Sequence, residues 1–309
     1  RRMRKMSKRP NNSDKILEAN ENFQKAEKCL KTGLTKWKPD HEGAAIAFER
    51  AGVCFKNAGE LEQAKNAYLK AAFSHYKSDA IFAAAKATES AGMVARDHTA
   101  SGGSAKDASD ILKKASAYYR ENGNIDKATD VLSKAAKVLE SDSGATDDAA
   151  AALYIEAVDM VIEGERETFN MDLFKQVTLF LLKAKRWQEA HQIYEKQVRA
   201  MRKLSQLNAI YKIYLSRIII CLSCNDYVAA TNMYDSFSKD DEGFWRSSEG
   251  QAAQELLSAF RERSEDALKK ALSNQMIGFL EMPIVRLAKA FSLGPSGKGG
   301  NSGDDSDIL

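Results

Sequence analysis

The sequence predicts an all-α protein, built as a right-handed solenoid of antiparallel helix hairpins. Three observations predict this fold class. A short pattern of alanine and large residues recurs along the chain at helical spacing. Only four of the 309 residues are proline, and none lies between residues 40 and 282, which argues against a turn-rich β-sandwich or barrel. The strong helix formers Ala, Lys, Glu and Leu are abundant.

The repeated pattern consists of alanine, a large residue four positions later, and a small or apolar residue three positions after that. Spacings of four and seven place these residues on one face of a helix. The copies are Ala44-Phe48-Ala51, Ala64-Tyr68-Ala71, Ala84-Thr88-Ala91, Ala108-Leu112-Ala115, Ala128-Leu132-Ala135 and Ala150-Tyr154-Ala157, with the weaker Ala190-Tyr194-Gln197 and Ala230-Tyr234-Phe237. Starts about 20 residues apart leave room for one helix and a turn, and two such helices form a hairpin. The pattern resembles a tetratricopeptide repeat with lengthened helices.

Glycine and asparagine near the expected helix ends indicate where the turns lie. The expected short turns are Asn57-Ala58-Gly59, Ser90-Ala91-Gly92 and Glu121-Asn122-Gly123-Asn124. Longer polar connections are expected at residues 101–104 and 141–144.

The chain divides into four expected regions. They are a basic arm or leading remnant at 1–13, the tetratricopeptide-like solenoid at 14–242, a C-terminal helical cap at 243–293, and a flexible Gly-rich acidic tail at 294–309. A cap is expected because the last repeat would otherwise expose an apolar face. Within it, residues 254–260 and 267–272 are expected to be helical. Pro283 is expected to interrupt the chain before a short last helix at 284–293.

The formal net charge of +3 is unevenly distributed. Six of the first ten residues are Lys or Arg, whereas the end of the chain is acidic, so the body is close to neutral. This balance lacks the charge signature of a nucleic-acid-binding protein. The longest apolar run, at 218–222, is far too short to span a bilayer.

Motifs for catalysis, metal binding and phosphate binding are not found in the sequence. It contains no Walker loop, no G-x-S-x-G nucleophile elbow and no H-E-x-x-H pair, and its four histidines are scattered. Cys221-Leu222-Ser223-Cys224 is a single C-x-x-C without the further ligands that zinc requires. We therefore predict no enzyme, no catalytic residue, no metal site and no cofactor.

One segment carries a family resemblance. Residues 26–40 read Ala-Glu-Lys-Cys-Leu-Lys-Thr-Gly-Leu-Thr-Lys-Trp-Lys-Pro-Asp. Together with the segments 44–58 and 62–65, they strongly resemble the soluble NSF attachment proteins. The run Lys-Trp-Lys-Pro-Asp is similar to the gamma branch of that family.

The resemblance implies an adaptor that binds SNARE complexes, made of syntaxin-type helices, and recruits and stimulates the hexameric NSF ATPase. That ATPase disassembles the SNARE bundle in vesicle fusion and intracellular protein transport, including transport between the endoplasmic reticulum and the Golgi. The implied location is the cytoplasm, peripheral on the cytosolic faces of endomembranes. The free protein is expected to be a monomer.

The resemblance also implies three groups of functional residues. The membrane-contact loop is Leu34, Lys36, Trp37 and Lys38; the ATPase-binding tail is Asp304, Asp305, Asp307, Ile308 and Leu309; the SNARE-binding candidates are Lys137, Lys183, Lys185, Arg186 and Arg217. A Trp between two Lys suits the headgroup region of an anionic bilayer. Each group has a plainer alternative: the Trp closes the first hairpin, the tail only solubilises, and the basic side chains are only solvated.

Two rival functions remain open. A different tetratricopeptide-like scaffold would capture peptides in a groove without any contact to NSF. A helical enzyme would need a deep pocket with converging titratable groups.

Overall fold

The computed structural model describes residues 12–33, 37–142 and 147–293. Within these ranges the chain forms α-helices and one 3-10 turn, and no strand. The predicted all-α class is therefore confirmed. The chain forms two compact units, Arg1–Leu173 and Phe174–Leu309.

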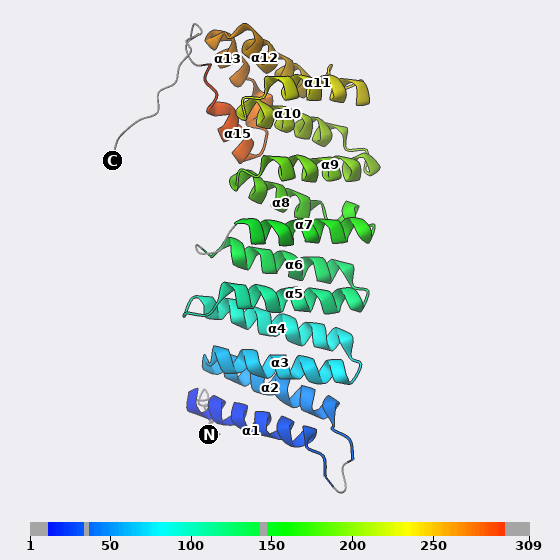
Figure 1. The fold of residues 1–309 in the computed structure, drawn as a ribbon, viewed down its shortest axis with the longest axis vertical. Coiled ribbons are helices and arrows are strands. Elements are labelled where there is room, and N and C mark those ends of the chain that lie inside the picture. The colour runs from blue at the N-terminus through cyan, green and yellow to red at the C-terminus, as the bar shows by residue number, and fades with distance from the viewer. Residues whose placement is uncertain (1–11, 34–36, 143–146, 294–309) are drawn as a thin grey trace, which may run out of the picture. The chain divides into compact units, whose positions relative to one another are not determined.

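In the first unit, each helix packs against the next helix along the chain as an antiparallel neighbour (Figure 1). The helices are α1 (Asn12–Leu30), α2 (His41–Ala58), α3 (Leu61–Lys77), α4 (Ile81–Thr99), α5 (Ala105–Glu121), α6 (Ile125–Glu140) and α7 (Asp147–Glu163), followed by the 3-10 turn η1 (Glu167–Phe169). This sequential stacking is the arrangement of a helical-repeat solenoid, in which each hairpin contacts only its neighbours.

The repeated pattern forms the core of this unit. All six strong copies are buried, from Ala44-Phe48-Ala51 on α2 to Ala150-Tyr154-Ala157 on α7. The alanines let neighbouring helices approach closely, and the large residues fill the space between them. Phe23 on α1 adds to this core, because its ring meets Phe48 edge-on at 5.1 Å between centroids.

Two of the three predicted turns are confirmed. In each of them a glycine in the left-handed backbone conformation follows the end of a helix. Gly59 has φ 83° and Gly123 has φ 78°, a region that glycine adopts without steric cost. The prediction of a turn at Ser90-Ala91-Gly92 is wrong, because this segment lies inside α4. A Cβ atom at Gly92 would lie 2.7 Å from the Leu112 side chain on α5, so this glycine serves close helix packing instead.

Ion pairs link helices that are two apart along the stack. Lys113 on α5 meets Glu156 on α7 at 3.0 Å, and Arg120 meets Glu163 at 3.0 Å. Both pairs join residues 43 positions apart, which is the length of one hairpin. Exposed pairs of this kind contribute little to the free energy of unfolding, but they mark the register between hairpins.

The second unit is built around α10. Its helices are α8 (Met171–Lys183), α9 (Trp187–Lys203), α10 (Leu207–Ser223), α11 (Tyr227–Asp240), α12 (Ser248–Glu262), α13 (Glu265–Leu272), α14 (Gln275–Gly278) and α15 (Met282–Lys289). The apolar helix α10 packs against α9, α11, α12 and α15. Burial on nearly every side explains its almost continuous apolar sequence.

Phe244 joins the cap segment to the helices before it. Its fully buried ring lies 5.3 Å from Tyr214 on α10 and 6.2 Å from Phe237 on α11, in both cases edge-on. Pro283 does not interrupt the chain, contrary to prediction, because it occupies the first turn of α15. Proline is tolerated there, since the first amides of a helix have no intrahelical acceptor. The last helix also ends earlier than predicted, at Lys289.

Across the described residues, no helix combines the length and the apolar character needed to cross a membrane.

Candidate partner-binding surface

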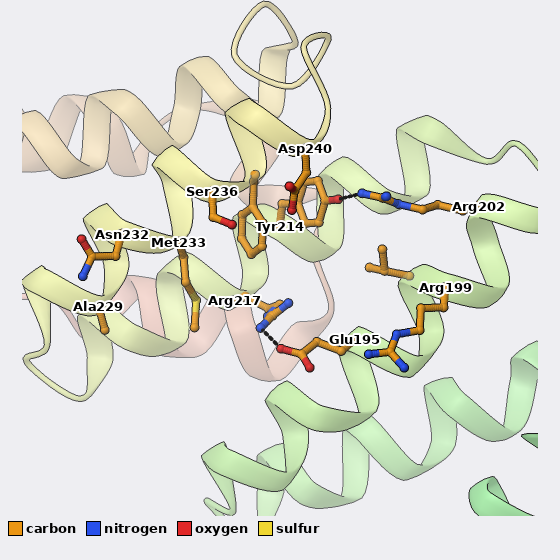
Figure 2. A pocket seen from close by; sticks show the side chains of 12 residues that line it. Glu195, Arg199, Arg202, Tyr214, Arg217, Ala229, Asn232, Met233, Ser236 and Asp240 are labelled. Carbon is orange, nitrogen blue, oxygen red and sulfur yellow. Dashed lines mark hydrogen bonds and ion pairs between the residues drawn. The ribbon is translucent and has the colours of Figure 1, made fainter.

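A pocket of about 560 Å³ lies in the second unit, between α9, α10 and α11 (Figure 2). Arg199 and Arg202 project from α9 on one side, and Asn232, Ser236 and Asp240 project from α11 on the other. Apolar side chains complete the lining, namely Val198, Ala229, Met233 and Phe237. A few polar groups around an apolar floor are the usual composition of a binding pocket.

Arg217 forms part of the pocket wall and is held in place by three neighbours. Its side chain is buried, its Nη2 donates to Glu195 Oε1 at 2.7 Å, and its Nε donates to His191 Nδ1 at 3.3 Å. The guanidinium also lies 5.1 Å from the ring centroid of Phe237, which is a cation–π contact. Arg217 is therefore committed to contacts within the fold.

Arg202 is the second arginine of the pocket that is held by contacts within the fold. It donates to the Tyr214 hydroxyl at 2.8 Å and to Asp241 Oδ2 at 2.9 Å. Burial and the hydrogen bond to Asp241 raise the pKa of Tyr214 to about 12, so the phenol stays protonated at neutral pH. These contacts fix the end of the pocket where α9 and α10 meet.

Arg199 is different, because within the described part of the chain it makes no hydrogen bond or ion pair. Asn232 also has no protein partner there. The pocket therefore offers one uncommitted guanidinium and one uncommitted amide across an apolar floor. This combination can bind an acidic side chain, since Arg pairs with carboxylates in a planar, two-bond geometry.

Four of the predicted SNARE-binding residues lie outside this pocket. Lys137 is exposed on α6 in the first unit. Lys183 and Lys185 are exposed at the turn between α8 and α9, where Lys185 adopts φ 57°. Arg186 immediately precedes α9, and its guanidinium donates to Glu189 at 2.6 Å. The structure thus places four of the five candidates in the second unit, Arg217 among them, whereas Lys137 lies in the first unit.

The predicted membrane loop is described only in part. Trp37 is 87% exposed and Lys38 is exposed, so this Trp does not close the first hairpin by burial. Leu34 and Lys36 lie outside the described residues. The predicted ATPase-binding tail, from Asp304 to Leu309, also lies outside them.

The pocket's arginine and amide pair could have been recognised in part from the sequence. Arg199 and Arg202 are three positions apart in a predicted helix, so they share a face. Asn232 could not be assigned, because nothing in the sequence places that face of α11 opposite α9.

Comparisons with known proteins agree with the sequence resemblance. Residues 17–275 match the family described as soluble NSF attachment protein, SNAP. A gamma-soluble NSF attachment protein of Dictyostelium discoideum is 33% identical over 282 residues, covering 91% of this chain and 84% of the relative. The gamma-soluble NSF attachment protein of Arabidopsis thaliana is 30% identical, covering 88% of this chain and 91% of the relative.

More distant likenesses exist as well. An alpha-soluble NSF attachment protein of Vitis vinifera is 29% identical, covering 83% of this chain and 86% of the relative. Among solved structures, BtubC from P. vanneervenii aligns over 96% of this chain and 100% of its own, with 11% identity and a low TM-score of 0.38. The match over residues 17–275 and the two gamma relatives show that the chain belongs to the soluble NSF attachment protein family.

Proposed function

We propose that the chain is an adaptor that binds SNARE complexes and recruits and stimulates the NSF ATPase during SNARE disassembly. The observation that carries this proposal is the family match over residues 17–275. Its relatives are named for attachment to NSF. A stack of helix hairpins suits such a role, because it presents an extended surface to other macromolecules. The adaptor supplies no catalysis and needs no cofactor.

The second unit supplies part of the SNARE contact in this proposal. Arg199, at the pocket between α9 and α11, has no hydrogen bond or ion pair among the residues that the structure describes, and Lys183 and Lys185 are exposed at the turn before α9. A SNARE bundle with an acidic surface would be attracted to these charges. Such contacts act over long range and weaken as the ionic strength rises. Lys137 is proposed as a separate contact in the first unit.

The loop around Trp37 supplies the membrane contact. Its exposed indole beside Lys38 combines an amphipathic ring with a cation, which suits the interface of an anionic bilayer. The protein would then act from the cytoplasm, peripherally bound to endomembranes. The acidic residues Asp304, Asp305 and Asp307, with Ile308 and Leu309, are proposed to contact and stimulate the ATPase.

The decisive experiment is a pull-down of NSF onto an immobilised SNARE complex, with and without this protein, in the presence of a non-hydrolysed ATP analogue. We expect NSF to be retained only when the protein is present. Retention of the protein on SNAREs without any NSF would instead support a peptide-binding scaffold of the same fold. Failure of both interactions would refute the adaptor function.

A further inference from the structure

One edge of the first unit carries exposed aromatic side chains. Because consecutive helices pack as antiparallel neighbours, the C-terminal ends of α1, α3, α5 and α7 lie at the same edge as the N-terminal ends of α2, α4 and α6 (Figure 1). In the described part of this unit the exposed aromatic residues are Trp37 (87%), Phe73 (56%), Tyr76 (40%), Phe82 (47%) and Phe169 (76%). Each of them lies in a connection at this edge or in the helical turn beside it.

The opposite edge of the unit has a different composition. Its connections include the small and polar runs Gly59-Glu60 and Ser101-Gly102-Gly103-Ser104. Among the residues that the structure describes, no exposed aromatic side chain lies at that edge. Both edges are formed by the ends of the same helices, so helix packing by itself does not explain why the aromatic residues lie on one of them. Exposed apolar side chains that gather in one place mark an interaction site.

The aromatic cluster consists of the residues around the turn between α3 and α4, namely Phe73, Tyr76, Lys77 and Phe82. The Lys77 ammonium lies 5.5 Å from the ring centroid of Phe73. Tyr76 stacks on Tyr118 of α5 at 5.2 Å between centroids, and Phe82 meets Tyr119 edge-on at 5.7 Å. Contacts within the unit therefore position the cluster, while its rings stay exposed.

An aromatic ring beside an ammonium group is suited to the interface of a bilayer. The ring prefers the headgroup region, and the ammonium meets anionic headgroups. Lys77 makes no ion pair within the described residues, so its charge is available to a lipid. Trp37 and Lys38, at the preceding connection of the same edge, present the same pair of groups.

The charge of this edge favours anionic lipid only slightly. Beside the two connections, the exposed lysines without an ion pair in the described part of the chain are Lys28, Lys31, Lys38 and Lys77. The acidic residues there that make no ion pair are Asp40, Glu42 and Asp79. The aromatic rings must therefore supply most of the affinity. Further along the edge, Arg166 beside Phe169 is already paired with Asp126 at 2.6 Å, which limits the contact to the first two hairpins.

We propose that the aromatic cluster is a second membrane-contact element, which lies against the same anionic bilayer as Trp37. The rings of Phe73 and Phe82 would enter the headgroup region, the Tyr76 hydroxyl would hydrogen-bond to headgroups, and the Lys77 ammonium would meet lipid phosphate. This second contact rests on the proposed membrane contact of Trp37 and extends it from one loop to an edge. Because both elements belong to one packed unit, the second contact forms at a high effective concentration once the first has formed.

The test is co-sedimentation of the full chain with phosphatidylcholine vesicles that contain or lack phosphatidylserine. We expect Phe73→Ser to weaken binding to the phosphatidylserine vesicles about fivefold, because one phenyl ring is lost from the interface. Phe73→Trp should bind at least as tightly as wild type, since Trp suits the headgroup region. Adding Trp37→Ser to Phe73→Ser should weaken binding further. Phe73 is the most exposed ring of the cluster, so its replacement should leave the fold intact, which circular dichroism checks.

Phe279→Ser is the matched control, because Phe279 has a similar exposure, 61%, but lies in the second unit. It should bind vesicles like the wild type. Recruitment of NSF onto soluble SNARE complexes without lipid separates the membrane contact from the adaptor function, and Phe73→Ser should support this recruitment fully. A wild-type chain that bound vesicles through Phe73 but failed to recruit NSF would refute the adaptor function alone.

Any of four results would overturn the proposal. Unchanged vesicle binding by a folded Phe73→Ser variant would confine the membrane contact to Trp37. An equal loss in Phe279→Ser would show nonspecific adsorption of aromatic side chains. Weak binding by Phe73→Trp would show that the ring at this position has another role. Absence of vesicle binding by the wild-type chain would refute both membrane contacts.

Discussion

Arg217 on α10 and Glu195 on α9 form an ion pair of 2.7 Å in which the two partners differ in exposure. The Arg217 side chain is 8% exposed, whereas that of Glu195 is 50% exposed. The guanidinium is therefore held inside the fold, and the carboxylate covers it from the solvent side. This geometry changes the interpretation of Arg217, because a charge already neutralised at close range contributes less to the attraction of an acidic partner.

We expect Arg217→Met to lower the free energy of unfolding by about 1–3 kcal/mol. The variant loses a charge-assisted hydrogen bond and the cation–π contact with Phe237. Urea unfolding followed by circular dichroism measures the change. Lys183→Met, at an exposed position, is the control and should stay within about 0.5 kcal/mol. An Arg217→Met protein of wild-type stability that no longer bound SNAREs would show a direct contact instead.

Arg199→Gln is expected to weaken SNARE binding while leaving stability unchanged. Arg199 has no partner to lose within the described residues, so the folded state pays no cost for the substitution. The dissociation constant, measured by surface plasmon resonance at two ionic strengths, should rise several-fold at low salt and less at high salt. If the variant bound SNAREs as tightly as the wild type at both salt concentrations, Arg199 would be excluded from the interface.

His191 is expected to make the second unit less stable in mild acid. Burial and the nearby Arg217 lower the pKa of His191 to about 4, while Glu195 acts in the opposite direction. The unfolded chain binds a proton near pH 6.5 and the folded chain near 4, so stability is lost as the pH falls through this interval.

The loss attributable to His191 is on the order of 2–4 kcal/mol between pH 6.5 and 4. Urea unfolding of wild type and of His191→Gln, compared at pH 7.5 and pH 5, isolates this contribution from those of the other three histidines. We expect a smaller drop for the variant. If wild type and variant lost the same free energy of unfolding between pH 7.5 and pH 5, His191 would not be a buried neutral group.

Trp37→Ser is expected to reduce binding to anionic liposomes without loss of helicity. The indole is 87% exposed, so its removal leaves no cavity in the fold. Liposome co-sedimentation reports the binding, and circular dichroism reports the fold. Trp245→Ser is a suitable control, because Trp245 is also exposed, at 47%, but lies outside the loop. Equal loss in both variants would show nonspecific aromatic adsorption.

Ile308→Ala is expected to lower stimulation of the NSF ATPase while SNARE binding persists. The tail is proposed to stimulate the ATPase and the helical body to bind SNAREs, so a change in the tail should affect only the first of these activities. Phosphate release measures the first activity, and SNARE pull-down measures the second. Loss of both together would argue against a separate role for the tail.

Much of the fold could be predicted because its core is periodic. Each strong copy of the Ala-large-Ala pattern is buried, since residues four and seven positions apart must share a helical face. The turn assigned to Ser90-Ala91-Gly92 failed because glycine serves two purposes: it ends helices, and it also admits a neighbouring side chain, here Leu112. The sequence gives no sign of which purpose applies.

The candidate sites could be predicted less completely than the fold, because they depend on contacts between different helices. The sequence by itself determined the all-α class, the hairpin repeat and the family, because these follow from local periodicity and from a contiguous motif. Only the tertiary structure showed that Arg217 is paired with Glu195, whereas Arg199 has no hydrogen bond or ion pair within the described residues. The physical reason is that a side chain's charge and hydrogen-bonding state depend on neighbours from other helices, and helical periodicity along one segment does not encode those neighbours.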